Sequence, residues 1–472
     1  MTFSPALLLI PLAVGLYHRF KPLPPGLACR GPWRSAADPQ LLTDLTFVDR
    51  TGRQGRHQEI FTAILAAIGG ARRLVVLDFF LYNDFTGQMT EQGLPLAEEL
   101  TSALLTRKKQ CPTMTIIVIT DPINTVYGSV ASAYFARLRG AGITVAMTRL
   151  DRLRDSNPLY SCWWWLLARP LTNGPGRLLA NPFGPGRISL GSFLRLLNFK
   201  ANHRKVLIAD QGETLIGLVG SANPHDASSS HSNVALRFAG PAAHDLLASE
   251  AAVLAFSGHK VPEFTPPPAP APTAAGNDCR IRILTESAIR AAALEAIAGT
   301  GPGDRIDLLM FYLSHRRLLQ ALRQAHRRGA RLRVLLDPNK DAFGRLKQGM
   351  PNRQVGYELH RLGIAVRWAA THGEQCHAKL LLIRRTNGTS SLLLGSANFT
   401  RRNLDDLNLE TDVEMQGPGH ATVFNDASHL FDSLWENTPD RLHSVEFTAF
   451  ADPSRTRRLL YRLLEATGLC TF

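Results

Sequence analysis

Residues 203–210 read HRKVLIAD and are followed by GSAN at residues 220–223; residues 377–384 read HAKLLLIR and are followed by the same GSAN at residues 395–398. In both copies His-x-Lys opens an apolar run that is typical of a buried strand, and side chains two positions apart lie on one face of a strand. A short turn and a second apolar run follow. We therefore predict a hairpin that brings Gly-Ser-Ala-Asn beside the histidine and the lysine.

Each copy thus gathers an imidazole, an ammonium, a hydroxyl and an amide, and two copies that meet face to face would supply two of each. This set suits a phosphodiester. The ammonium and amide groups can hold the charged phosphate oxygens. One imidazole can attack phosphorus while the other protonates the leaving alcohol. We expect no metal and no cofactor, because the lysines neutralise the charge.

The spacing His203-x-Lys205-x4-Asp210 with Gly220-Ser221-x-Asn223, together with its second copy, resembles the double HKD signature of the phospholipase D superfamily. Within that superfamily the chain is most similar to the bacterial cardiolipin synthase and phospholipase D-like branch, over residues 57–440. One departure is clear, because the second copy carries Arg384 where the first has Asp210. The resemblance implies an α/β fold of two tandem phospholipase D-like α/β/α domains, related by a pseudo-twofold axis, with the active site at their interface.

The resemblance also implies a two-step mechanism through a phosphohistidine, with His203 as nucleophile and His377 as general acid and then base. The expected catalytic set is His203, Lys205, Asp210, His377 and Lys379, in which Asp210 is a supporting residue. The expected phosphate-binding residues, of which the serines could instead hold the turn, are Ser221, Asn223, Ser396 and Asn398. If the two rings were more than roughly ten ångströms apart, beyond the reach of one substrate, this mechanism would fail.

A histidine nucleophile needs a partner on its other ring nitrogen. Glu410, downstream of the second Gly-Ser-Ala-Asn, resembles the acidic residue that the family carries there, and it is the expected orienting residue. The matching stretch of the first copy has no acid, so either Asn233 takes that place or a residue elsewhere in the chain does. This difference between the copies bears on which histidine is the nucleophile.

The order of elements around the motif is also duplicated. A helix at 57–69, strands at 73–82 and 113–120, and a helix at 95–107 are expected before the first motif. A strand at 305–313, a helix at 316–328 and a strand at 331–336 precede the second motif. The expected domains are a hydrophobic anchor and spacer at 1–35, a first domain at 36–260 with an insertion near 151–198, a Pro-rich linker at 261–278, and a second domain at 279–472 with a C-terminal basic helix.

The net charge of +14 favours an anionic partner, although a solubilising basic surface is the alternative reading. Residues 3–17 are uncharged and apolar, and at 15 residues they are shorter than the roughly 20 that span a bilayer. We expect an uncleaved, tilted or interfacial anchor there, with a buried N-terminal helix as the alternative. The cluster Trp163-Trp164-Trp165 suits either a membrane interface or a packed satellite cluster. The basic amphipathic helix at 454–469 suits either lipid or its own domain.

These features favour a membrane-associated phospholipase D or phosphatidyltransferase that resembles cardiolipin synthase. Its expected partners are an anionic phospholipid membrane, a phospholipid substrate and an alcohol or water acceptor. We expect a monomer at the inner membrane with its catalytic domains in the cytoplasm. The alternatives are a phosphodiesterase that acts on nucleic acid, and a catalytically silent scaffold. If residues 3–17 and the tryptophan cluster lie on the same side of the fold as the mouth of the active site, a lipid substrate is favoured. A long basic groove without exposed apolar groups would instead favour nucleic acid.

Overall fold

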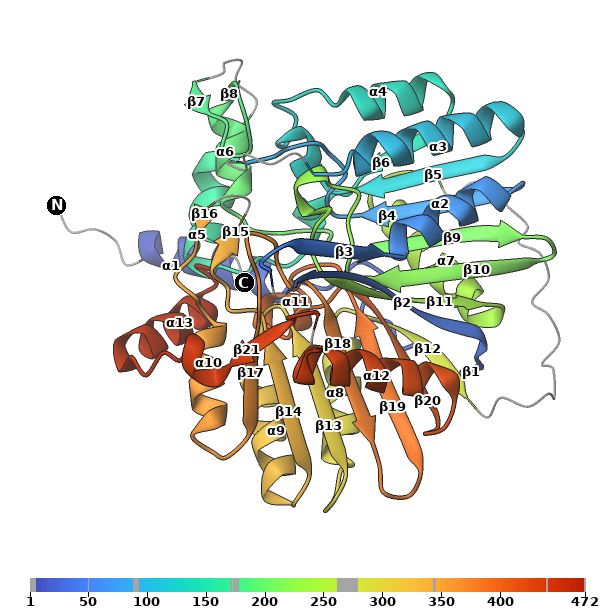
Figure 1. Ribbon diagram of the computed structural model, residues 1–472. Coiled ribbons are helices and arrows are strands. Elements are labelled where there is room, and N and C mark those ends of the chain that lie inside the picture. The colour runs from blue at the N-terminus through green and yellow to red at the C-terminus, as the bar shows by residue number, and fades with distance from the viewer. Residues whose placement is uncertain are drawn as a thin grey trace.

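The computed structural model describes residues 6–49, 51–87, 93–169, 172, 178–260, 279–342, 345–438 and 440–470. Two large mixed sheets dominate it, one built mainly from each half of the chain (Figure 1). The predicted α/β fold class with two related halves is therefore confirmed. The predicted linker at 261–278 lies outside the described residues.

The first sheet has eight strands, of which β4, β5 and β6 are parallel to one another and the others are antiparallel. Its strands, in spatial order, are β3 (Gln54–Gln58), β2 (Ala37–Val48), β11 (Asn233–Ala239), β10 (Thr214–Gly220), β9 (Lys205–Gln211), β4 (Leu74–Phe79), β5 (Thr115–Thr120) and β6 (Thr144–Met147). Its helices are α2 (Ile60–Gly70), α3 (Leu96–Gln110), α4 (Ala133–Gly140) and α7 (Pro241–Phe256).

The second sheet has nine strands and repeats this order, with β13, β14 and β17 parallel. Its strands are β1 (Arg34–Ser35), β12 (Arg280–Thr285), β20 (Thr411–Pro418), β19 (Thr389–Gly395), β18 (Lys379–Arg384), β13 (Arg305–Met310), β14 (Arg331–Leu336), β17 (Ala365–Ala369) and β21 (Ser444–Glu446). Its helices are α8 (Ser287–Ala298), α9 (Arg316–Arg327), α10 (Asn352–His360), α11 (Arg401–Leu404) and α12 (Thr422–Glu436).

The inner faces of the two sheets meet in one continuous hydrophobic core. Strand β4 is buried on both faces, so alternate side chains serve different cores. Val76 faces the shared core together with Leu246 of α7, Leu392 of β19 and Phe424 of α12. The outer faces pack separately against α2, α3 and α4 in the first half and against α8, α9 and α10 in the second. A shared core fixes the two halves relative to each other, which an active site between them requires.

Strand register places both motif lysines at the same edge of their sheets. Lys205 pairs with Phe79 at the end of β4, and Lys379 pairs with Met310 at the end of β13. These are the carboxyl ends of the central parallel strands, where loops from several elements converge. The duplicated fold therefore brings the two motifs to one place.

The N-terminal segment joins both halves. Sequence analysis placed residues 1–35 in a separate anchor and spacer, but Arg34–Ser35 pairs with β12 at the edge of the second sheet. Strand β2, which the sequence did not indicate, then pairs with β11 in the first sheet. The N-terminal segment is therefore tied directly to both sheets.

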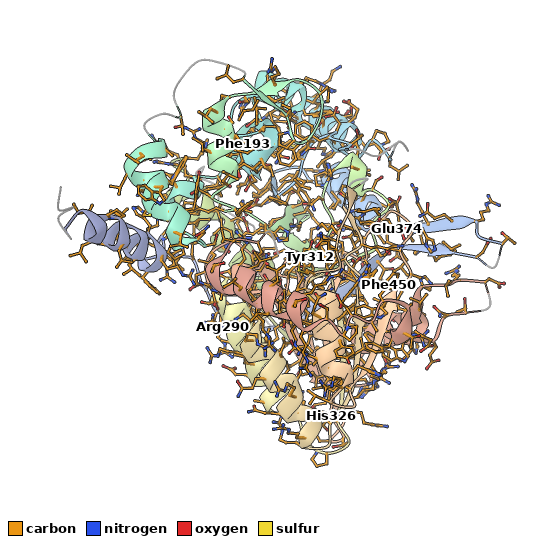
Figure 2. The ribbon with its side chains drawn as sticks, turned by 90° about the vertical axis from the view of Figure 1, so that its left-hand side faces the viewer. Phe193, Arg290, Tyr312, His326, Glu374 and Phe450 are labelled. Carbon is orange, nitrogen blue, oxygen red and sulfur yellow. The ribbon has the colours of Figure 1, made fainter. Side chains whose placement is uncertain are left out.

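The segments outside this repeated core gather along one side of the molecule (Figure 1). They are α1 (Ala6–Phe20), α5 (Pro158–Trp163), the short π-helical turn η3 (Trp164–Ala168), α6 (Leu190–Leu196), the ribbons β7 (Leu179–Ala180)–β8 (Arg187–Ile188) and β15 (Asp341–Ala342)–β16 (Arg345–Leu346), and α13 (Arg455–Thr467). Figure 2 turns this side toward the viewer, with Phe193 of α6 above and Tyr312 near the centre.

Candidate active site

The two motif histidines face each other across the boundary between the halves. Their ring centroids are 6.4 Å apart. Reciprocal backbone bonds hold them there, because His203 N–H donates to the carbonyl of Leu409 (2.9 Å) and His377 N–H donates to that of Ser232 (2.8 Å). Each motif is thereby joined to the other half of the chain, and one phosphorus atom can lie within reach of both imidazoles.

His203 lies against the carboxylate of Glu410, which comes from the second half. Its Nδ1 is 3.0 Å from a Glu410 oxygen, so Nδ1–H donates and Nε2 is left with its lone pair. Glu410 is fully buried, and it also accepts hydrogen bonds from Ser396 Oγ and Asn403 Nδ2. Burial raises the pKa of Glu410 to about 7, against the opposing effect of Lys205. The first motif therefore has an acidic orienting residue, supplied across the boundary.

His377 has neutral partners instead. Its Nδ1 is 3.0 Å from the Ser221 carbonyl oxygen and 3.2 Å from Asn233 Oδ1. Asn233 is held in turn by Ser221 Oγ, which donates to its Oδ1 at 2.9 Å. Both acceptors fix the same tautomer that Glu410 fixes in His203, but neither carries a charge. Asn233 therefore takes the place behind His377 that Glu410 takes behind His203.

Both lysines are buried beside the histidines. Lys205 Nζ donates to the carbonyl of His203 and Lys379 Nζ to that of His377, each at 2.6 Å. Each ammonium also lies 5.2 Å from the centre of an aromatic ring, Phe80 for Lys205 and Phe311 for Lys379. Burial lowers the pKa of Lys205 to about 7 and that of Lys379 well below its usual value. An anion bound between them would reverse this effect.

Burial also lowers the pKa of both histidines well below 6.5, and the two lysine ammonium groups lower it further. Both rings are therefore neutral in this structure. A neutral imidazole with Nδ1–H in place is the form that can attack through Nε2. The protonated form that an acid requires needs a negative charge in the pocket, which a phosphodiester substrate supplies.

The serines and asparagines of the two Gly-Ser-Ala-Asn segments differ in which of their polar groups already have hydrogen-bond partners. The hydroxyl of Ser221 bonds Asn233 and that of Ser396 bonds Glu410, so both serines hold the orienting residues. Asn223 Oδ1 accepts from Leu81 N–H at 3.1 Å. The Oδ1 atom of Asn398 is buried without a hydrogen-bond partner within the described parts of the chain. An amide oxygen only accepts, so the Nδ2 groups of Asn223 and Asn398 are the atoms that would donate to a phosphate, and phosphate binding by all four residues remains a prediction.

Asp210 does not belong with the groups that touch substrate. It lies five residues beyond Lys205 on β9, about 16 Å along the strand. Its carboxylate accepts the backbone N–H groups of Arg72, Arg73 and Leu74 at 2.7–3.1 Å, which fixes the start of β4. Asp210 was expected as a supporting residue, and its carboxylate bonds the backbone at the far end of β9 from Lys205.

The second half meets the same need from the neighbouring strand. Arg384, which stands where Asp210 stands in the first copy, pairs in register with Arg305. Just before Arg305, Asp304 accepts the N–H of Thr386 at 2.8 Å and that of Gly301 at 2.9 Å. Asp304, which precedes β13, therefore bonds the backbone just beyond the end of β18, whereas Asp210 lies on β9 and bonds the start of β4.

Two further aspartates clamp the residue before each histidine. Asp121 accepts the N–H of Asn202 at 2.7 Å, and Asp337 accepts that of Cys376 at 2.8 Å. Burial raises the pKa of Asp121 to about 7 and that of Asp337 to about 6. Both follow a buried strand as Asp-Pro, and this repeated pair was the sequence signal that could have identified them.

An ion-pair network supports the first motif alone. The middle residue of its His-x-Lys is Arg204, fully buried and paired with Glu286 at 2.8 Å and with Glu250 at 3.1 Å. Glu286 also accepts the backbone N–H of Glu410 at 3.1 Å. In the second motif the middle residue is Ala378. Arg204 and Glu286 therefore fix the backbone at both His203 and its carboxylate partner.

Part of the chain matches a known family, and its fold is similar to that of solved structures. Residues 293–435 match the family model described as cardiolipin synthase, PLD-like domain. Among curated proteins, no sequence matches this chain. Of solved structures, a phosphatidylserine synthase from Haemophilus influenzae Rd KW20 is similar with a TM-score of 0.57 and 10% identity, over 93% of this chain and 97% of that one.

Two more structures are similar over less of their length or with a lower score. One is a polyphosphate kinase from Porphyromonas gingivalis, with a TM-score of 0.45 and 13% identity over 90% of this chain and 52% of that one. The other is the phospholipase D family member Nuc from Salmonella typhimurium, with a TM-score of 0.28 and 19% identity over 35% of this chain and 99% of that one. The family match confirms the predicted relationship to the phospholipase D superfamily and, at that level, the prediction of an enzyme. The roles of the individual site residues are not tested by these comparisons.

Proposed function

We propose, from the phospholipase D-like domain at residues 293–435, that this chain is a membrane-associated phospholipase D or phosphatidyltransferase of the cardiolipin synthase type. It would cleave and transfer phosphatidyl groups through a phosphohistidine on His203. The observation that supports this most strongly is the pair of imidazoles 6.4 Å apart, each beside a buried lysine. That arrangement offers one phosphate group a nucleophile, an acid and two cations.

In the first step, Nε2 of His203 forms a bond to phosphorus and the bond to the leaving alcohol breaks. The alcohol oxygen takes the Nε2 proton of protonated His377, so His377 becomes neutral. The phosphorylated His203 ring keeps its Nδ1 proton and gains positive charge. The Glu410 carboxylate 3.0 Å away stabilises that charge, and His377 has no equivalent. We therefore assign His203 as the nucleophile.

In the second step, water or an acceptor alcohol gives its proton to Nε2 of His377 and its oxygen attacks phosphorus. The phosphorus–nitrogen bond breaks and its electron pair returns to His203, which becomes neutral again. Lys205 and Lys379 hold the non-bridging oxygens throughout, with the amides of Asn223 and Asn398 as further donors. The acceptor alone decides between hydrolysis and transfer.

Lipid, and not nucleic acid, is the substrate class that the surface favours. The insertion that carries α5, η3 and α6 follows β6, so it starts at the sheet edge where the motif lysines lie. It presents Trp163, which is 55% exposed, and α1 packs against α5 with Leu9 and Leu12 exposed. The insertion therefore starts at the edge that carries the motif lysines, and together with α1 it exposes apolar side chains, which supports a lipid substrate.

The tryptophan cluster combines both predicted roles. Trp163 is exposed, Trp164 is buried, and Trp165 stacks on His18 of α1 at 3.9 Å between ring centres. Lys21 and Arg169 lie over the same Trp165 ring. Exposed apolar side chains above a row of cations match the interface of an anionic bilayer. We place α1 and the insertion in that interface, on the cytoplasmic side of the inner membrane.

Among the helices of the described residues, none is both long enough and apolar enough to cross a bilayer.

The decisive assay uses the purified full-length chain with phosphatidylglycerol vesicles, scored for cardiolipin plus glycerol against phosphatidic acid plus glycerol. Either product pair at a rate that His203→Ala abolishes supports the proposal. Single-stranded DNA of equal phosphate concentration is the parallel substrate. Cleavage of DNA with no turnover of lipid would overturn the proposal and favour the nucleic-acid alternative.

A further inference from the structure

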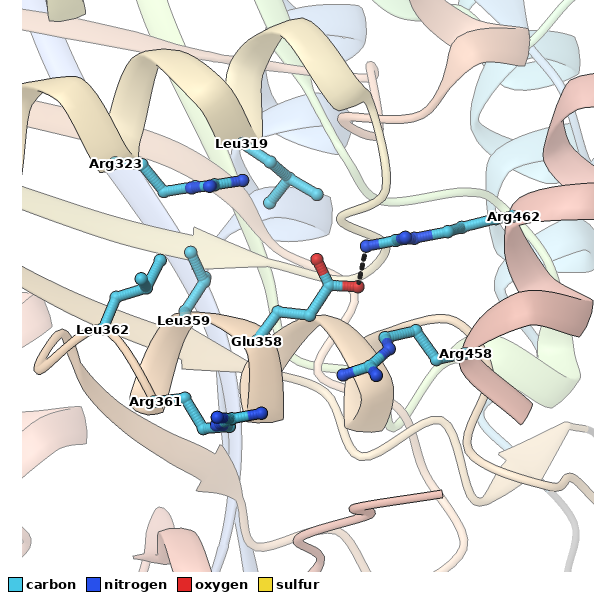
Figure 3. Close-up of a pocket in the computed structure, with 8 residues that line it drawn as sticks. All are labelled: Leu319, Arg323, Glu358, Leu359, Arg361, Leu362, Arg458 and Arg462. Carbon is cyan, nitrogen blue, oxygen red and sulfur yellow. Dashed lines mark hydrogen bonds and ion pairs between the residues drawn. The ribbon is translucent and has the colours of Figure 1, made fainter. Parts of the chain in front are cut away.

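A basic pocket lies between α9, α10 and α13. Its volume is ≈ 260 Å³. Four arginines from these three segments converge on it around Glu358, as Figure 3 shows, and leucines of α9 and α10 form its floor. The four are Arg323, Arg361, Arg458 and Arg462. None of the residues that we assign to catalysis lines this pocket.

The single carboxylate of the pocket is already neutralised. Glu358 accepts from Arg462 at 2.9 Å, from Arg316 at 3.2 Å and from the Tyr461 hydroxyl at 2.8 Å. Arg323, Arg361 and Arg458 have no carboxylate within ion-pair distance among the residues that the structure describes. The pocket therefore carries an excess of guanidinium groups, which recognise phosphate by paired hydrogen bonds.

Helix α13 forms one wall of the pocket and is oriented with its leucines outward. Its Tyr461 and Glu465 are buried against the second half, and Glu465 bonds Ser314 Oγ at 2.6 Å. Leu459 and Leu463, on the opposite face, are 70% and 58% exposed. A helix that served only to pack on its own domain would bury its leucines. The outward leucines instead suit insertion into an apolar medium.

The pocket arginines lie beside this apolar stripe. Arg458 and Arg462 are one residue before and three after Leu459, so they lie on the flank of α13 between its buried face and its leucines. When the leucines enter the acyl boundary of a bilayer, these guanidinium groups are at headgroup depth. A phosphate at that depth belongs to a lipid.

We propose that the pocket between α9, α10 and α13 binds the phosphate of an anionic lipid headgroup while the leucines of α13 enter the same bilayer. The bound lipid is an anchor and not the substrate, because the catalytic histidines lie elsewhere. This inference rests on the proposed function only in sharing an anionic membrane as partner. The pocket gives the enzyme a preference for anionic lipid that is separate from turnover.

The test compares binding of the full-length chain to phosphatidylcholine vesicles with and without phosphatidylglycerol. The pocket variant is Arg323→Gln with Arg361→Gln. The control, Lys109→Gln with Arg139→Gln on α3 and α4, removes the same charge from exposed sites elsewhere. We expect the pocket variant to bind phosphatidylglycerol vesicles roughly ten- to thirtyfold more weakly than wild type, and the control to change by less than about threefold. Equal losses in the two variants would overturn the proposal.

Two further arms identify the source of the phosphate and the role of α13. Leu459→Ser with Leu463→Ser is expected to weaken binding to both vesicle types, whereas the pocket variant weakens only the anionic one. Inorganic phosphate at millimolar concentration is expected to leave vesicle binding unchanged. If inorganic phosphate displaced the protein from phosphatidylglycerol vesicles and stabilised wild type but not the pocket variant, the pocket would be a free-phosphate site.

Turnover of a short-chain soluble phosphatidylglycerol separates this inference from the proposed function. The pocket variant is expected to turn it over at the wild-type rate. Suppose that wild type turns over no phospholipid, while the pocket variant still binds anionic vesicles more weakly than wild type. This result would contradict the proposed function and leave the inference standing. A pocket variant that lost soluble turnover while keeping vesicle binding would overturn the inference.

Discussion

The two halves share a strand order and a His-x-Lys motif, but they differ in what lies behind each imidazole. His203 has the buried carboxylate of Glu410, and His377 has the neutral Ser221 carbonyl and Asn233. A carboxylate stabilises a ring that carries lasting positive charge, as a phosphohistidine does. A neutral acceptor leaves a ring free to gain and lose a proton. The two halves thus place a carboxylate behind one histidine and neutral acceptors behind the other, and the proposed division of roles rests on this difference.

The buried ion pairs behind the motifs also differ between the halves, and only the first motif has them among the described residues. Arg204 connects the first motif to Glu250 and Glu286, and Glu286 also holds the backbone of Glu410. Ala378 makes no such connection. The half that carries the proposed nucleophile is thus the one whose backbone is fixed by buried charges, which would keep that imidazole aligned.

The largest effect that separates the halves is expected from His377→Ala. With an alkyl alcohol as leaving group, this variant should lose about 10²–10⁴ in kcat, because the alcohol then departs without a proton. With p-nitrophenol as leaving group, the first step needs no acid and the burst of p-nitrophenol should survive. His203→Ala should lose the burst with both substrates. A burst that His377→Ala loses and His203→Ala keeps would reverse the assignment.

Glu410→Gln is expected to lower kcat by about 10- to 100-fold, because a hydrogen bond to a charged group contributes roughly 1.5–3 kcal/mol. Asn233→Ala is the matched change behind His377. It should cost less than about tenfold, since the Ser221 carbonyl still fixes that ring. Steady-state kinetics with a check of thermal unfolding measures both. Equal losses would remove the distinction between the halves.

The pH dependence of kcat/KM should reveal the lysine of the first half. Burial lowers the pKa of Lys205 to about 7, while Glu410 opposes that shift. The ammonium that binds phosphate is therefore lost as the pH rises through about 7, and kcat/KM should fall there. Glu410→Gln removes the opposing charge, so the fall should move to lower pH. A fall that moved to higher pH in this variant would contradict the pairing.

The smallest effects are expected at the far ends of the motif strands. Asp210→Ala leaves three backbone N–H groups without their acceptor and should lower the free energy of unfolding by about 1–3 kcal/mol, with kcat of the folded enzyme unchanged. Arg384→Ala should change it by less than about 0.5 kcal/mol. Urea unfolding with parallel assays measures both. A large loss of kcat in Asp210→Ala would return that residue to the catalytic set.

Much of this fold could be predicted because its signals are local. The strand β5 ends at Thr120 and is followed by Asp-Pro, and β14 ends at Leu336 and is followed by the same pair. Strand β2 escaped prediction, because its buried face carries Asp44 and Thr46, which conceals the alternation. Asp44 is buried there because it accepts the N–H groups of Glu59 and Ile60 at the start of α2.

The site was predictable in its residue types and not in its pairings. The repeated motif identified the histidines and lysines, and the missing acid at Asn233 marked the asymmetry. That Glu410 reaches His203 across the halves depends on the hydrogen bond from His203 N–H to the Leu409 carbonyl, which joins residues 206 positions apart. Such a contact has no local signal in one sequence. The outward leucines of α13 likewise depend on which face Tyr461 buries.

The most direct measurement identifies the residue that carries the covalent intermediate. Enzyme quenched in acid-free denaturant during turnover of phosphatidylglycerol labelled in its phosphatidyl part is digested, and the labelled peptide is sequenced by mass spectrometry. The account predicts label on His203, its absence in His203→Ala, and accumulation in His377→Ala with an activated leaving group. Label on His377 in the wild-type enzyme would contradict it.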